Sequence, residues 1–127
     1  MTAVTAPPTT RVGHVIATLP LGIELRELAC RALDFGRLGA HKMTILLVSE
    51  HDLELTDLDS ACRRLATLVR ERTDEGCAVR LVVRHGPVDQ ALSDLMIRES
   101  TDLVLVPDTI ELLDPDAVPC PVVPLEP

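Results

Sequence analysis

The sequence predicts an α/β protein: a three-layer sandwich in which helices cover both faces of a parallel five-stranded sheet. Four short, nearly continuous apolar runs, as in strands buried on both faces, occupy residues 12–18, 43–48, 78–83 and 103–106. The segments between them carry apolar residues every three or four positions, as amphipathic helices do. Strands that alternate with helices are joined by right-handed crossovers and lie parallel. We therefore expect five strands in the order 3-2-1-4-5.

Composition and charge narrow the classes of partner. The 127 residues fit one domain, and with one Phe and no Trp or Tyr its core must be aliphatic. The chain therefore lacks the aromatic platforms on which single-stranded nucleic acids stack. Its net charge of −8 opposes binding to any polyanion. We expect no nucleic-acid partner.

Segment composition also bears on location. No apolar run is long enough to span a membrane, and the first residues lack the basic and apolar stretches of a signal peptide. The cysteines, Cys30, Cys62, Cys77 and Cys120, are far apart, whereas zinc ligands usually come in closely spaced pairs. We interpret them as reduced packing residues, with Cys120 as the most exposed thiol. These features predict a cytoplasmic protein without membrane contact.

The first half of the chain carries clear helix boundaries. Residues 1–10 are small, polar and proline-containing, so we expect a disordered segment ahead of a domain at residues 11–127. The first helix is expected at residues 23–38, where Gly39 would end it in the left-handed conformation. The second helix is expected at 57–73, with Thr56 as its N-cap and Asp59 as the partner in a capping box.

The second half carries edge and turn signals. Arg80 alternates with apolar residues, which places the third strand near an edge of the sheet. Gly86 and Pro87 open a third helix that ends near Ser100. Proline cannot donate to a strand ladder, so a last strand at residues 122–123, flanked by prolines, must be brief and at an edge.

Four segments carry a family resemblance. They read RVGHVIATLP, ALDFGRLGAHKMTILLVSE, HGPVDQALSDLMIRESTDLVLVPDT and PCPVV. With them the chain resembles the universal stress protein family over residues 11–124. The resemblance implies a Rossmann-like fold of the adenine nucleotide alpha-hydrolase-like superfamily, a role in stress response or regulation, and a homodimer formed through the last strand.

The chain departs from the family's nucleotide-binding members at the phosphate site. Those members carry a glycine motif after the fourth strand, because backbone amides must approach the phosphates closely. Here no glycine follows Gly86, and the position reads Pro107-Asp108-Thr109 with further carboxylates at 111, 114 and 116. The family's Asp-Gly-Ser type turn after the first strand is replaced by Leu19-Pro20-Leu21. We therefore expect no ATP binding and no cofactor.

A rebuilt pocket is the alternative at the same place. In a parallel sheet, ligands bind at the carboxyl ends of the strands. The residues that the sequence puts there, of which Val48 and Gly86 match positions lining the family's pocket, are Thr18, Val48, Gly86, Asp108 and Thr109.

Two histidines offer a metal alternative. His51 and His85 follow the second and third strands, so adjacent parallel strands would bring both to one edge, near Asp108. The competing interpretation, two loop histidines in solvent, predicts no metal site.

The sequence shows no nucleophile motif such as G-x-S-x-G, and we expect no catalytic activity. The leading hypothesis is a non-catalytic module similar to universal stress proteins, which does not bind ATP and acts through protein contacts or self-association. The alternatives are a sensor of a small ligand or nucleotide with a rebuilt pocket, and a metal-dependent accessory protein using His51, His85 and Asp108.

Overall fold

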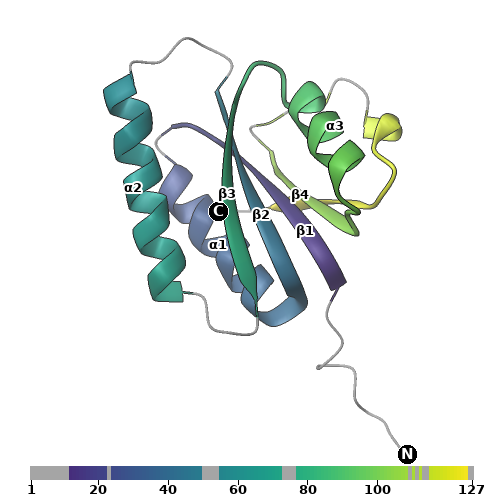
Figure 1. Cartoon of the computed structure of the whole chain (residues 1–127), viewed down its shortest axis with the longest axis horizontal. Helices are drawn as coiled ribbons and strands as arrows, with labels where there is room; N and C mark the ends of the chain where they lie inside the picture. The colour runs from purple at the N-terminus through teal and green to yellow at the C-terminus, as the bar shows by residue number, and fades with distance from the viewer. Residues whose placement is uncertain are drawn as a thin grey trace, which may run out of the picture.

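A five-stranded parallel sheet forms the centre of the molecule, in the order β3-β2-β1-β4-β5 (Figure 1). The computed structural model describes residues 12–22, 24–49, 55–72, 77–108, 110, 112 and 115–125. Both the α/β class and the strand order confirm the prediction from the sequence. The expected disordered segment, residues 1–10, lies outside the described residues. The elements are β1 (Val12–Pro20), α1 (Leu25–Gly39), β2 (Ala40–Ser49), α2 (Leu55–Arg72), β3 (Ala78–His85), α3 (Val88–Arg98), β4 (Leu103–Pro107), the 3-10 turn η3 (Pro115–Ala117) and β5 (Val122–Leu125).

Helices cover both faces of the sheet. Figure 1 shows α1 and α2 on one side and α3, with η3 beside it, on the other. Alternate residues of each strand point to opposite faces, so the sheet divides the aliphatic core in two. The larger cluster lies under α1 and α2, and the smaller lies under α3. The smaller cluster is completed by Ile110, Leu112, Val118 and Cys120 from the connection between β4 and β5.

The junction of α1 and β2 corrects one expectation. Gly39 is the last residue of α1, but Gly86 is the only described glycine with a positive φ, so Gly39 does not close the helix in the left-handed conformation. Instead Ala40 is already extended (φ −136°) and donates its N–H to the carbonyl of Gly36. The chain passes directly from helix to strand, so β2 begins at Ala40, three residues before the expected Met43.

Gly36 has a packing role in the same helix. A Cβ added there would lie 2.9 Å from Cε of Met43, a fully buried residue of β2. The missing side chain lets α1 approach the sheet closely.

The start of α2 corrects a second expectation. An N-cap has a non-helical backbone, whereas Thr56 lies inside the helix, which begins at Leu55. Asp59 forms an ion pair with Arg63, one turn later, at 2.8 Å.

The two edges of the sheet match the sequence analysis. Arg80 lies on the edge strand β3, as predicted. The last strand, β5, is four residues long and parallel to β4. Directly before it, the carbonyl of Pro121 accepts a hydrogen bond from the amide of Val104 (3.0 Å). Among the described helices, none has both the length and the apolar character needed to cross a membrane.

Candidate functional site

At the carboxyl edge of the sheet, two of the residues expected to line a pocket fill positions in the core instead. Thr18 is fully buried, and its hydroxyl donates a hydrogen bond to the carbonyl of Leu105 (3.0 Å). Val48 is 5% exposed and belongs to the apolar cluster under α3. Neither side chain is available to a ligand. Pairing of β1 with β4 explains why Thr18 is buried, and packing of β2 against α3 explains why Val48 is buried.

Gly86 is explained by the turn it makes. Its φ of 113° is a left-handed value that side chains rarely tolerate, while a Cβ there would meet open space. Its amide donates to the carbonyl of Ser49 (2.8 Å). That amide, a potential phosphate donor, is therefore already used between the ends of β2 and β3.

The exit of β4 is a short, negatively charged turn. Pro107 has no N–H, and its carbonyl accepts a hydrogen bond from the amide of Ile110 (3.0 Å). Asp108 is exposed at the same point. Thr109 lies outside the described residues. The described residues here offer the carboxylate of Asp108 and a turn closed by a backbone hydrogen bond, whereas a phosphate needs free backbone amides.

Of the predicted histidine pair, the structure describes only His85, so the pairing stays a prediction. His85 is exposed at the end of β3, and His51 lies outside the described part of the chain. Among the residues that the structure describes, no three His, Cys, Asp or Glu side chains are grouped closely enough to hold a metal ion.

A polar network lies instead at the opposite, amino edge of the sheet. It consists of His14, Lys42, Thr44, Arg80 and Glu99, and we name it the amino-edge network. Glu99 follows α3 and accepts hydrogen bonds from Lys42 (2.8 Å) and from both Arg80 amino groups (3.1 and 2.6 Å). Hydrogen bonds from Lys42 and Arg80 lower the pKa of the Glu99 carboxyl from 4.5 to about 2.

The buried part of the network has a defined direction. Arg80 donates to the hydroxyl of Thr44 (3.1 Å), so that hydroxyl is free to donate to Nε2 of His14 (2.8 Å). Nδ1 of His14 lies 2.9 Å from the carbonyl of Ser100, which only accepts, so the imidazole proton resides on Nδ1. His14 is therefore a buried structural residue with both ring nitrogens hydrogen-bonded.

Asp102 ties the same edge together through the backbone. Its carboxylate accepts from the amide of His14 (2.9 Å), and its own amide donates to the carbonyl of His14 (2.9 Å). A Cβ on Gly13 would lie 2.8 Å from this carboxylate, so glycine is needed for the approach. The arrangement joins β1 to the start of β4.

The thiols are poorly suited to nucleophilic chemistry. Cys120 is half-buried and packs against the apolar cluster under α3, and Cys30 and Cys62 are also half-buried. Burial, and then the nearby Asp102 carboxylate, raise the pKa of the Cys120 thiol. Burial and Asp59 raise the pKa of Cys62 in the same way. A raised pKa keeps less of the thiol as the reactive thiolate.

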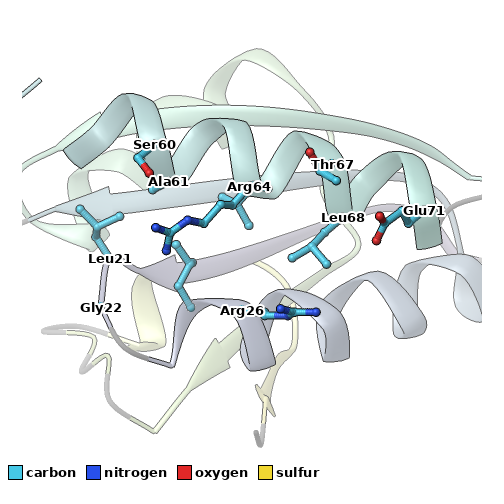
Figure 2. A pocket seen from close by; sticks show the side chains of 11 residues that line it. Leu21, Gly22, Arg26, Ser60, Ala61, Arg64, Thr67, Leu68 and Glu71 are labelled. Atoms are coloured by element: carbon cyan, nitrogen blue, oxygen red, sulfur yellow. The ribbon is translucent and has the colours of Figure 1, made fainter. Parts of the chain in front are cut away.

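An open cavity lies between α1 and α2 in the part of the chain that the structure describes (Figure 2). Its volume is about 770 Å³, within the range of ligand pockets. We name it the α1/α2 groove, and it is lined by Leu21, Gly22, Leu25, Arg26, Ser60, Ala61, Arg64, Leu65, Thr67, Leu68 and Glu71.

The sequence did not predict the groove, because charged residues beside an apolar stripe usually mark a solvated helix face. The only available signal was the presence of Arg26 and Arg64 beside the apolar stripes of their helices. Comparison of the chain with protein-family models, with curated proteins and with solved structures gives no match.

Proposed function

We propose that the chain is a non-catalytic module similar to universal stress proteins, which does not bind ATP and acts through protein contacts in stress response or regulation. Support comes from the strand order 3-2-1-4-5 together with the sequence segments that resemble the family. The observation that carries the proposal is that Thr18 and Val48, at the carboxyl edge, are buried in the core.

Electrostatics at the exit of β4 support the same conclusion. A triphosphate placed there would meet the Asp108 carboxylate, and it would find Pro107 without an amide and the amide of Ile110 already bonded. Two unit charges of the same sign at about 4 Å repel by roughly 4 kcal/mol near a protein surface. No glycine of this chain lies after Gly86 to let backbone amides approach a phosphate closely.

Self-association and location in the cell complete the proposed function. We propose a cytoplasmic protein, and its contacts include self-association as a homodimer. The usual route through the last strand is limited here because Pro124, within the four residues of β5, lacks an N–H. Other surfaces must therefore carry most of any contact.

A ligand screen tests the proposal. The full chain is heated with MgATP, with cyclic nucleotides and with divalent metals, and the same mixtures are examined by native mass spectrometry. A ligand at about 100 times its dissociation constant stabilises the native state by about 2.7 kcal/mol, which raises the Tm by several degrees. We expect no shift with nucleotide and no bound nucleotide mass.

Two outcomes of this screen would change the assignment. A magnesium-dependent rise in Tm with ATP contradicts the proposal and favours the nucleotide sensor. A stoichiometric metal adduct lost on replacing His85 favours the metal-dependent accessory protein instead.

A further inference from the structure

We propose that the α1/α2 groove binds an acidic, partly apolar peptide segment of a partner protein. The inference rests on the proposed function, since it names the surface and the chemistry of the protein contact. At one end the α1/α2 groove reaches Leu21 and Gly22, which follow the carboxyl end of β1, and the rest of its lining comes from α1 and α2.

The floor of the groove is apolar and long enough for a short extended segment. It is formed by Leu25, Leu65 and Leu68, which are nearly buried, and by the half-buried Leu21 at one end. From Ser60 to Glu71, α2 spans about 16 Å at its rise of 1.5 Å per residue. An extended peptide of about five residues covers that length.

The charge of the groove sets the chemistry of its occupant. Arg26 and Arg64 are exposed at the groove and, within the described residues, neither has a carboxylate within 4.0 Å. Two other arginines of α2 are paired: Arg63 with Asp59 at 2.8 Å and Arg72 with Asp34 at 3.3 Å. The groove thus presents two available guanidinium groups, which bind carboxylates through paired hydrogen bonds.

The spacing of these groups favours a peptide over a single small anion. Figure 2 shows Arg64 reaching from α2 toward α1, while Arg26 extends along α1 to a separate point below Leu68. Two acidic side chains on one segment can therefore each engage one of these arginines. Glu71 lies at the far end of the groove from Leu21, so the occupant carries a neutral or basic residue there.

The overall charge of −8 does not override this local arrangement. At physiological ionic strength, charges beyond about 8 Å are largely screened, so the two guanidinium groups dominate at contact distance. Repulsion at longer range lowers the association rate rather than abolishing the complex. The hydroxyls of Ser60 and Thr67, on the α2 side, can bond the backbone of the segment.

Fluorescence anisotropy with three synthetic peptides tests the proposal on the full chain. The three peptides carry leucines at the same positions. The positions between the leucines are all Glu in the first peptide, all Gln in the second and all Lys in the third. The variants Arg26→Gln and Arg64→Gln each remove one groove charge. Their matched controls, Arg31→Gln on α1 and Arg70→Gln on α2, remove one exposed charge outside the groove.

We expect the Glu peptide to bind about tenfold more tightly than the Gln peptide, and the Lys peptide not to bind. Each groove variant weakens binding of the Glu peptide by about tenfold, and each control changes it by less than about twofold. Because all four arginines are exposed, the Tm of every variant should match that of the wild type.

Several results would overturn the proposal. Equal affinity for the Glu and Gln peptides would show that the arginines do not attract acidic side chains. Equal losses of affinity in the groove variants and in the controls would place the contact elsewhere. Binding of decanoate without binding of any peptide assigns the groove to a small amphiphile. Concentration-dependent dimerisation that Arg64→Gln abolishes, without peptide binding, assigns it to a second copy. Each of these results leaves the nucleotide screen unaffected, so failure here is distinct from failure of the proposed function.

Discussion

Thr44 joins three strands through one hydroxyl group. It accepts a hydrogen bond from Arg80 of β3 and donates to His14 of β1, while its own backbone belongs to β2. Thr44 is fully buried and His14 is 6% exposed, so water does not replace either bond. Buried polar groups cost free energy when they are unpaired. These hydrogen bonds therefore favour the observed register of the three strands over registers shifted by one or more residues.

Thr44→Val tests that role. Valine has nearly the same shape, so the main effect is to leave Nε2 of His14 unpaired in the core, and we expect a loss of about 1–3 kcal/mol in the free energy of unfolding. Urea denaturation measures it. The control is Thr67→Val, because Thr67 is exposed and its hydroxyl donates only to the carbonyl of Arg63 within α2. A control loss equal to that of Thr44→Val would show that the buried chain contributes nothing specific.

Glu99 makes stability depend on acid pH. Its pKa is lowered to about 2 in the folded protein from an ordinary value of 4.5. A lowered pKa means that the stabilisation is present above the ordinary pKa and is lost as the pH falls through the folded one. We therefore expect Tm to fall between about pH 4.5 and pH 2 because of this group.

Glu99→Gln isolates this contribution. The variant should have a lower Tm than the wild type at pH 7, and the difference should shrink toward zero as the pH approaches about 2. Circular dichroism melting curves across this range measure it. Two parallel curves, with a constant difference at every pH, would contradict the assignment.

Single residues differed in how far the sequence could predict them. His14 could be identified as structural because a histidine in the middle of an apolar strand needs partners. Glu99 could not, because its partners Lys42 and Arg80 come from two other elements and meet it only after the sheet has formed. The role of Thr18 could not be predicted either. Its position at a strand end predicted a pocket, but its hydroxyl donates a hydrogen bond to the carbonyl of Leu105.

At the scale of elements, α1 depends on a close approach to β2. Gly36 allows this approach, since a Cβ there would lie 2.9 Å and 3.0 Å from the terminal carbon and sulfur of Met43. At Gly39, one turn later, a Cβ would meet the Phe35 ring at 3.6 Å, an ordinary contact. The two glycines of one helix thus face different surroundings.

Substitution by alanine separates them. Alanine gains about 1 kcal/mol of helix propensity over glycine, whereas overpacking a core costs about 1–3 kcal/mol. We expect Gly36→Ala to be destabilising by about 1 kcal/mol and Gly39→Ala to be neutral or stabilising. Chemical denaturation of both variants gives the comparison. A more stable Gly36→Ala would mean that Met43 moves aside without cost.

Element boundaries were predicted less well than element types. The apolar run that marks β2 starts at Met43, but the strand starts at Ala40 because pairing with β1 and the direct exit from α1 extend it. Thr56 carries an N-cap signature yet lies inside α2. Both errors arise because local propensity does not contain the position of neighbouring elements.

At the scale of the whole molecule, the alternation of strands and helices predicted a parallel sheet, and the observed strand order is the expected 3-2-1-4-5. The rules of parallel sheets limit such a chain to few topologies, and the prediction needed no side-chain detail. The α1/α2 groove could not be predicted, because it depends on how far apart two helices lie on one face. The fold class therefore followed from the sequence, while the surface that we propose to be functional required the structure.

The absence of nucleotide binding at the carboxyl edge is tested most directly by a two-dimensional 15N–1H NMR titration of the full chain with MgATP. The amides of Val48, Gly86 and Asp108 report on the edge where a nucleotide would bind. We predict that their resonances stay in place up to about 1 mM nucleotide, which corresponds to a binding free energy weaker than about −4.1 kcal/mol. Saturable shifts of these three amides at lower concentrations would contradict the account.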